Sequence, residues 1–200
     1  MTNSQRHGWL GSLCKPSPSR SVLFLVALGI VIGAAGRFAF DTTMQATNTE
    51  EFCISCHEME ANPYAQLQKT SHFNNASGVR PDCSDCHVPH EFLPKMVRKI
   101  QASREVWGSI TGIIDTPEKY AAHAPIMKQR EIKRLQANDS QECRNCHETE
   151  RMLTALQSAK AQQYHQARQL NNKTCIDCHA GIAHPDSTTD SVPAAKQPPP

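Results

Sequence analysis

A Cys-x-x-Cys-His pattern occurs four times in this 200-residue chain and constrains its fold more than any other feature. Eight of the nine cysteines belong to the pattern, at residues 53–57, 83–87, 143–147 and 175–179. Two thiols three residues apart can form thioethers on one edge of a porphyrin, and the histidine that follows can bind the iron. The pattern predicts four covalently bound haem c groups, attached through Cys53, Cys56, Cys83, Cys86, Cys143, Cys146, Cys175 and Cys178.

Paired cysteines have two other common uses in proteins. Zinc ribbons and knuckles also contain Cys-x-x-Cys pairs, but a zinc site does not require a histidine directly after every second cysteine. A disulfide framework is common in exported domains, but it leaves the four trailing histidines unexplained. The repeated histidine therefore favours haem over both alternatives.

The composition agrees with a fold built around bound groups. Aromatic residues make up only 6% of the chain, which is little for a domain that must form its own apolar core. The net charge of +2 and the mean hydropathy of -0.53 favour neither a nucleic-acid binder nor a polytopic membrane protein. No strand pattern of useful length is present, so we expect an all-α fold in which short helices and loops pack around four haems.

An apolar run near the N-terminus predicts one transmembrane helix over residues 21–40. The residues before the run include three cations and no acidic residue, which predicts a cytoplasmic lead (1–20) and a haem domain (41–185) in the periplasm. A cleaved signal peptide is the alternative, although no clear A-x-A site follows the run. Cys14 lies in the lead without an evident role, and residues 186–200 are rich in proline and expected to be disordered.

Each haem iron needs a sixth ligand unless that position is kept open. Five histidines of the predicted haem domain lie outside the motifs: His72, His90, His123, His165 and His184. They suffice for three bis-histidine irons, although any one of them could instead be a surface residue. In the first motif, Met59 follows His57 by two residues and could replace it as ligand or could simply pack in the interior.

The chain resembles the NapC/NirT family of membrane-anchored tetra-haem quinol dehydrogenases. The resemblance covers nearly the whole chain and is carried by Cys-Ser-Asp-Cys-His-Val-Pro-His at 83–90, Arg-Glu-Val-Trp-Gly at 104–108 and Ile-Asp-Thr-Pro-Glu-Lys at 114–119. Further stretches are Asn-Asp-Ser-Gln-Glu-Cys-Arg-Asn-Cys-His at 138–147 and Thr-Cys-Ile-Asp-Cys-His-Ala-Gly-Ile-Ala-His at 174–184.

The resemblance implies a set of axial ligands. Met59 is favoured over His57 at the first haem, and the motif histidines His87, His147 and His179 bind the other three irons. The distal partners are His184 for the second haem, His72 for the third and His165 for the fourth, with His90 as a second choice. His123 matches no ligand of the family and is expected at the surface.

The resemblance also implies a quinol site beside the first haem. Glu105 occupies the place of an acidic residue on the far side of that haem, and a basic residue completes the pocket. Arg98 aligns best with this basic residue, Lys99 next and Lys95 less well. A basic amphipathic helix is predicted over 93–107, either at the lipid surface or as an ordinary solvated helix. Further helices are predicted over 116–136, with Thr116 as cap, and over 148–170.

The function implied is oxidation of menaquinol or ubiquinol at the bacterial inner membrane, with electrons passed to a periplasmic nitrate reductase through its di-haem subunit. One alternative is a relay or anchor for another reductase, of nitrite or trimethylamine oxide, without its own quinol site. The third candidate function is that of a terminal multihaem reductase. The histidine count disfavours it, because three irons are then six-coordinate.

Overall fold

The computed structural model describes residues 21–185, without the side chains of 167–171. The chain forms two units, residues 1–45 and 46–200. The predicted cytoplasmic lead with Cys14 and the predicted disordered tail lie outside the described residues. In the first unit, helix α2 (Val22–Ala46) is long and apolar enough to cross a membrane, and its last residue belongs to the second unit.

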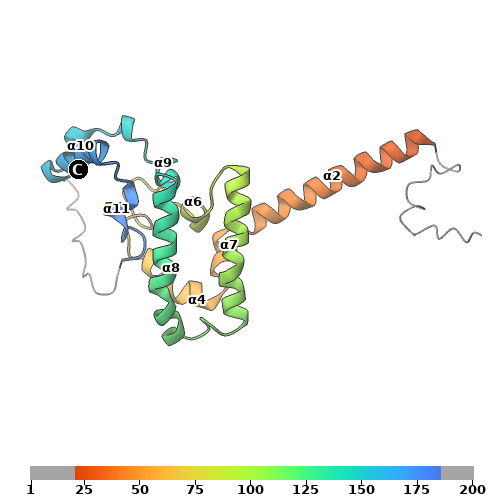
Figure 1. The fold of residues 1–200 in the computed structure, drawn as a ribbon, viewed down its shortest axis with the longest axis horizontal. Helices are drawn as coiled ribbons and strands as arrows, with labels where there is room; N and C mark the ends of the chain where they lie inside the picture. The colour runs from red at the N-terminus through yellow and green to blue at the C-terminus, as the bar shows by residue number, and fades with distance from the viewer. Residues whose placement is uncertain (1–20, 186–200) are drawn as a thin grey trace, which may run out of the picture. The chain divides into compact units, whose positions relative to one another are not determined.

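The described part of the second unit, which we call the haem domain, is helical and contains no strand, which confirms the all-α prediction. Its two long helices, α7 (Phe92–Ile110) and α8 (Pro117–Ala137), lie side by side and antiparallel (Figure 1). The shorter elements are α3 (Glu50–Ile54), α4 (His57–Met59), η1 (Glu60–Tyr64), α5 (Ala65–Leu67), α6 (Cys83–His87), α9 (Gln141–Arg144), η2 (Thr149–Arg151), η3 (Thr154–Leu156), α10 (Ala159–Asn171) and α11 (Cys175–His179).

Helix α8 begins where its sequence predicts. The Thr116 hydroxyl accepts a hydrogen bond from the Lys119 amide at 3.3 Å, and Pro117 takes the first helical position. A proline fits there because that amide has no partner within the helix. The predicted start at Thr116 is confirmed.

Two haem motifs form single helical turns, and an aspartate within each motif caps its turn. In α6 the Asp85 carboxylate accepts the Asp82 amide at 2.7 Å, and in α11 the Asp177 carboxylate accepts the Thr174 amide at 2.7 Å. Both turns are capping boxes, in which the side chain three residues into the helix binds back to the residue before it. The aspartate inside Cys-x-Asp-Cys thus fixes the spacing of the two thiols.

The helix predicted over 148–170 is wrong in its first half. Residues of this half form the two 3₁₀ turns η2 and η3, and the α-helix α10 starts only at Ala159. The Ser158 hydroxyl accepts the Ala161 amide at 3.2 Å, which caps a new helix at this point. This local hydrogen bond outweighs the general helix propensity of the preceding residues.

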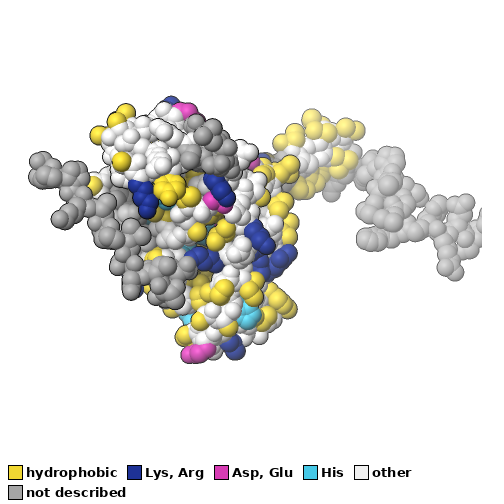
Figure 2. Space-filling view, turned by 60° about the vertical axis from the view of Figure 1, so that its left-hand side comes forward, with side chains coloured by type: hydrophobic (Ala, Val, Ile, Leu, Met, Phe, Trp, Pro, Cys, Tyr) yellow, Lys and Arg dark blue, Asp and Glu magenta, His cyan; other side chains and the backbone are white. Residues whose placement is uncertain are grey.

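The polypeptide of the haem domain encloses little apolar volume. Among the described residues, the buried apolar side chains are Leu67, Ile114, Leu135 and Ile176. Large apolar side chains are instead exposed at many points, as Figure 2 shows for one face of the domain. A domain this size would normally bury far more apolar surface, so the interior requires bound groups to complete it.

Candidate functional site

The four motifs lie in space in the order of the chain. Helix α3 carries Cys53 and packs on α6, and α6 packs on α9, which carries Cys143. The Ile176 amide of α11 donates to the Ser140 hydroxyl at 3.2 Å, and Ser140 directly precedes α9. Each motif is therefore a neighbour of the next.

The cysteine thiols follow the same order. The Cys53 thiol is hydrogen-bonded to that of Cys83, and this contact lowers the pKa of Cys53 to about 7. Burial raises the pKa of Cys86 to about 11, and the neighbouring Cys143 thiol acts in the same direction. In thioether linkage these sulfurs carry no proton, so the shifts mark only which thiols are neighbours.

Three pairs of histidines face each other across the haem domain. The ring centroids are 6.1 Å apart for His87 and His184, 6.1 Å for His72 and His147, and 6.3 Å for His165 and His179. These are the three pairings that the sequence resemblance implies. Each joins a motif histidine to one outside the motifs, and only His165 is close in sequence to its partner.

The spacing of the pairs fits an iron between two imidazoles. A metal–imidazole bond is about 2 Å long and the ring centroid lies about 1 Å behind the bonding nitrogen, so two opposed imidazoles have centroids about 6 Å apart. All three pairs have this separation. The donor set and its geometry therefore fit three six-coordinate haem irons.

Three imidazoles of these pairs have a lowered pKa, which favours the neutral form that binds metals. Burial and then the opposed His87 lower the pKa of His184 to about 4. Burial and the opposed ring likewise lower the pKa of His72 and of His179. Near neutral pH the lone pairs of these three histidines are consequently free for iron.

The first motif is arranged differently from the other three. The His57 ring is largely exposed, and its Nε2 donates to the backbone carbonyl of Asp115 at 3.1 Å. The Met59 side chain is half-buried in the turn that follows. The adjacent Glu58 is 3% exposed and accepts a hydrogen bond from Ser109 of α7 at 2.9 Å. This arrangement ties His57 to the 111–116 loop and leaves Met59 as the candidate ligand.

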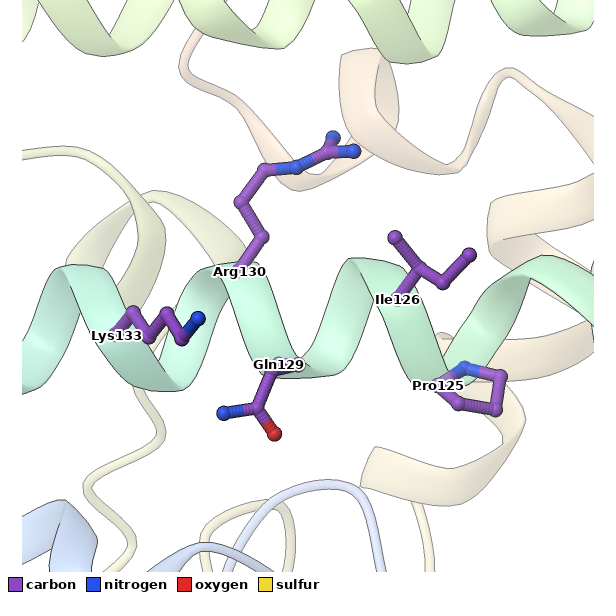
Figure 3. A pocket seen from close by; sticks show the side chains of 5 residues that line it. All are labelled: Pro125, Ile126, Gln129, Arg130 and Lys133. Atoms are coloured by element: carbon purple, nitrogen blue, oxygen red, sulfur yellow. The ribbon is translucent and has the colours of Figure 1, made fainter.

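Glu105 lies between the two long helices. One carboxylate oxygen accepts from Arg130 of α8 at 3.1 Å, and the other is buried without a hydrogen-bond partner. Arg130 also lines a hollow of about 400 Å³ along α8, together with Pro125, Ile126, Gln129 and Lys133 (Figure 3). The Arg130 contact gives no signal in the sequence, because residues 105 and 130 meet only through packing of the two helices.

The three basic candidates on α7 have different surroundings. The Lys99 ammonium donates to the backbone and hydroxyl oxygens of Thr47 at 2.9 and 2.7 Å, and burial lowers its pKa. Arg98 instead donates to the backbone carbonyl of His87 at 3.1 Å and lies 3.7 Å from Glu131. Lys95 is half-buried. Arg98 therefore belongs to the surroundings of the second motif, and Lys99 lies nearer the segment that leads into the first.

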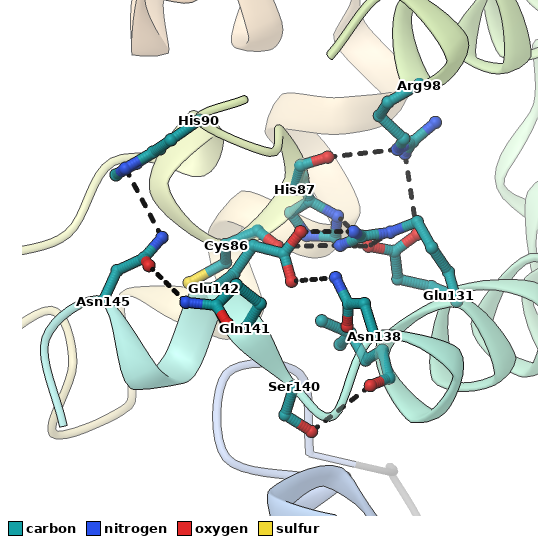
Figure 4. Close-up of polar contacts among 12 residues, drawn as sticks. Cys86, His87, His90, Arg98, Glu131, Asn138, Ser140, Gln141, Glu142 and Asn145 are labelled. Carbon is teal, nitrogen blue, oxygen red and sulfur yellow. Dashed lines mark hydrogen bonds and ion pairs between the residues drawn. The ribbon is translucent and has the colours of Figure 1, made fainter. Parts of the chain in front are cut away.

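A polar network joins the second and third motifs (Figure 4). Arg134 of α8 donates to the Cys86 carbonyl at 3.0 Å, to Glu131 at 2.7 Å and to Glu142 at 2.6 Å. Glu131 in turn accepts from Nδ1 of His87 at 3.0 Å. The sequence did not single out Arg134, Glu131 and Glu142. Charged residues at helical spacing have the same sequence pattern on a helix face that contacts water as on one that contacts a haem.

The remaining histidines lie apart from the pairs. His90 is exposed, with its Nδ1 3.4 Å from the Asn145 side chain. The half-buried His123 donates to the Lys119 carbonyl within α8 at 3.0 Å. Within residues 21–185 no three His, Cys, Asp or Glu side chains converge on a possible metal site, and the motif cysteines form no disulfide. Neither the zinc nor the disulfide alternative finds support in this part of the chain.

Four attachment turns in sequence, each beside the next and three of them closed by a histidine pair, define a tetra-haem c-type cytochrome. Residues 15–189 match the NapC/NirT cytochrome c family, N-terminal region. The chain belongs to this family and carries four covalently bound haem c groups. It is a single-pass membrane protein of the electron-transport class, with α2 as its anchor.

Several proteins of the family are similar over most of their length. The cytochrome c-type protein NapC of Escherichia coli K12 is 52% identical over 169 residues, 84% of each chain. The denitrification system component NirT of Stutzerimonas stutzeri is 46% identical over 188 residues, 93% of this chain and 94% of that one. NapC of Paracoccus pantotrophus is 49% identical over 179 residues, 88% of this chain and 76% of that one. The predicted membership of the NapC/NirT family is confirmed.

One solved structure is also similar, the cytochrome c nitrite reductase NrfHA complex bound to the HQNO inhibitor. The match has a TM-score of 0.47 and 23% identity, and covers 82% of this chain and 93% of that chain. At this level of similarity nothing about the site follows from it.

Proposed function

We propose that this cytochrome oxidises a membrane quinol beside its first haem and delivers the electrons from its fourth haem to a periplasmic reductase. The observation that carries the proposal is the order of the motifs. Among the described residues, the histidines of the second, third and fourth motifs each face another histidine, and that of the first motif does not. When bound, each haem supplies an iron that takes up and releases one electron at a time.

The first motif is the proposed place of entry. Met59 is the axial ligand we assign to it, in place of His57, whose ring is held by the Asp115 carbonyl. Each of the other motifs is assigned its facing histidine as sixth ligand. A small molecule such as quinol is therefore expected to approach the first motif rather than the others.

Glu105 is the proposed proton acceptor for quinol. Its buried, unpartnered oxygen is an acceptor site with no competing hydrogen bond, while Arg130 holds the other oxygen. A positioned carboxylate of this kind can take a proton from a hydroxyl as the electrons leave. Arg130 then fixes the orientation of the carboxylate.

Lys99 is the basic residue we assign to the quinol oxygen, in preference to Arg98 and Lys95. The Arg98 guanidinium donates to the His87 carbonyl and lies near Glu131, so it contacts the second motif and not the first. Lys99 is a compact cation with three donors, of which Thr47 takes up part. An ammonium here can stabilise negative charge on a quinol oxygen while its proton departs.

The outer side of α7 supports contact with lipid. Its basic residues 95, 98 and 99 are half-buried, which is the reverse of a solvated basic face, and most of the side chains that α7 exposes are apolar, beside the exposed Gln101, Ser103 and Arg104. The large apolar side chains it exposes are Phe92, Leu93, Val97, Ile100, Val106, Trp107 and Ile110. A helix of this character is stable at the headgroup boundary, where a quinol could reach the first motif without crossing water.

The electron acceptor we propose is a periplasmic nitrate reductase, through a di-haem subunit. The relatives named NapC support this choice, while those named NirT and TorC keep other reductases as possible acceptors. The cations at residues 6, 15 and 20 support a cytoplasmic N-terminus, which puts the haem domain in the periplasm.

Reduction by a quinol analogue tests the proposal. Detergent-solubilised protein is mixed with the reduced analogue without oxygen, and the haem absorbance is followed. We expect rapid reduction of the wild type and a loss of about 100-fold or more in rate for Glu105→Gln, the lower end for removal of a general base. Lys99→Met should also be slow, whereas Arg104→Met, on the exposed side of α7, should react like the wild type.

Dithionite serves as the control, because it should reduce all these proteins equally if their haems are intact. Wild-type haem that dithionite reduces and quinol does not would refute the quinol site and favour a relay between proteins. Equal quinol rates in Glu105→Gln and the wild type would refute the assigned proton acceptor.

A further inference from the structure

The histidines of the three pairs differ in what their second ring nitrogen contacts. Nδ1 of His87 donates to a carboxylate oxygen of Glu131 at 3.0 Å (Figure 4). Nδ1 of His165 donates to the neutral amide oxygen of Gln157 at 2.7 Å. Among the hydrogen bonds of the described residues, only that of His87 joins a paired histidine to a carboxylate.

His184 and His72, the distal histidines of the other two contacts with a motif histidine, lack such a hydrogen bond at Nδ1. Nδ1 of His184 and Nδ1 of His72 are both buried and have no hydrogen-bond partner. Since iron binds the other ring nitrogen, the group at Nδ1 decides how strongly each ring donates electrons to the metal.

Two arginines favour the charged form of Glu131, and both also donate hydrogen bonds to the backbone of the second motif. Arg134 donates to Glu131 and to the Cys86 carbonyl, and Arg98 donates to the His87 carbonyl while lying 3.7 Å from Glu131. Both cations thus fix the carboxylate and the backbone of the motif relative to each other. The His87 ring can then take only a narrow range of orientations.

A carboxylate at Nδ1 raises the basicity of a ligating imidazole more than a neutral amide does. A more basic ligand favours ferric over ferrous iron and lowers the reduction potential. We propose that Glu131 is a positioning residue that orients His87 and lowers the reduction potential of the second haem. Gln157, as a neutral acceptor, leaves the fourth haem without this effect. The proposal rests on His87 as an iron ligand and is independent of which molecule donates the electrons.

The change from Glu131 to Gln tests the proposal, because it removes the charge and keeps the shape. The four haems of the purified protein are titrated by spectroelectrochemistry, and the second haem is identified by the loss of its bis-histidine signal in His184→Ala. We expect the reduction equilibrium of the second haem to shift toward ferrous iron by about tenfold, which is about 59 mV for one electron. Its electron paramagnetic resonance signal should change with it, because the His87 ring then donates to a neutral amide oxygen in place of a carboxylate.

Gln157→Glu is the matched variant at the other pair. It places a carboxylate at Nδ1 of His165, so the fourth haem should shift toward ferric iron, opposite in sign to the first variant. If Glu131→Gln fails to load four haems, Glu131→Asp decides, since it keeps the charge but shortens the reach to His87 and should raise the same potential. An unchanged potential and resonance signal of the second haem in a fully loaded variant would overturn the proposal.

A purely structural role for Glu131 predicts a different result. In that case the variant would lose stability with all four potentials unchanged. Quinol-driven reduction is measured separately, so a failed quinol assay with the expected potential shift would refute the proposed function and leave this inference intact.

Discussion

Replacing Arg134 by methionine should destabilise the haem domain strongly. The Arg134 side chain is 17% exposed and lies between Glu142, 1% exposed, and Glu131, 21% exposed. Methionine keeps the apolar stem but leaves Glu142 without its cation, Glu131 with only Arg98 at 3.7 Å, and the Cys86 carbonyl without its donor. Removal of one partner from a buried ion pair typically costs 3–5 kcal/mol, so we expect a loss of about 3 kcal/mol or more.

Arg151→Met is the matched control for this variant. Arg151 also pairs with a glutamate, Glu148, at 2.7 Å, but the two side chains are 81% and 51% exposed. An exposed pair of this kind contributes about 0–1 kcal/mol. The same chemical change should therefore have little effect at this position.

The assay is unfolding of the haem-loaded protein in guanidinium chloride, followed by circular dichroism and by loss of the low-spin haem spectrum. The free energies of unfolding of the two variants should differ by about 2 kcal/mol or more. Arg134→Lys, which keeps one charge but loses the planar fork, should fall between Arg134→Met and the wild type. Fully loaded Arg134→Met that unfolds within about 1 kcal/mol of Arg151→Met would refute the reasoning, because the network would then contribute no more than an exposed pair.

Three further outcomes are expected. Ser140→Ala removes the acceptor of the buried Ile176 amide and should cost about 1–3 kcal/mol in chemical unfolding. Ser103→Ala, which removes an exposed hydroxyl that donates to the Ile100 carbonyl, should cost less, and equal losses would contradict the assignment. Thr116→Ala removes the cap of α8 and should cost about 1 kcal/mol, while Thr116→Ser should be neutral. Burial raises the pKa of Glu131, but its contacts with His87 and Arg134 outweigh this and hold the pKa well below its usual range. The stability from Glu131 is therefore fully present above its unfolded pKa of about 4.3 and is lost as the pH falls toward the folded value, so the deficit of Glu131→Gln relative to wild type should shrink in acid unfolding scans below about pH 4. A deficit that stays constant with pH would show that the carboxylate is not what is lost.

The sequence determines the attachment turns and long helices because their signals are local. Each motif carries its cysteines, histidine and, in two cases, the capping aspartate within five residues, and Thr116–Pro117 marks the start of α8. The spacing of residues within one motif does not indicate which other histidine pairs with the motif histidine. The three pairings came from resemblance to the family, and the opposed rings now lie at metal-binding separation. Their assignment as ligands is still a prediction that spectroscopy must test.

The rest depends on contacts between distant segments. Arg98 is the first choice for the quinol site from the family resemblance, but α8 brings Glu131 within 3.7 Å of it and its side chain donates to the His87 carbonyl of the second motif. Arg130 reaches Glu105 for the same reason. The orientation of α7 about its own axis likewise depends on the polar side chains of α8 and of the motifs, because these pair with the polar residues of α7. Periodicity gives the two faces of a helix but not which one is covered.

Near-infrared magnetic circular dichroism of the oxidised, fully loaded protein tests most directly whether the histidine pairs hold haem iron. It distinguishes low-spin iron with two histidine ligands from iron with other ligands. We expect three bis-histidine haems and one distinct haem, with one bis-histidine signal lost in each of His72→Ala, His165→Ala and His184→Ala. Four alike signals, or variants that leave all three bis-histidine signals in place, would contradict the assignment of these pairs as iron ligands.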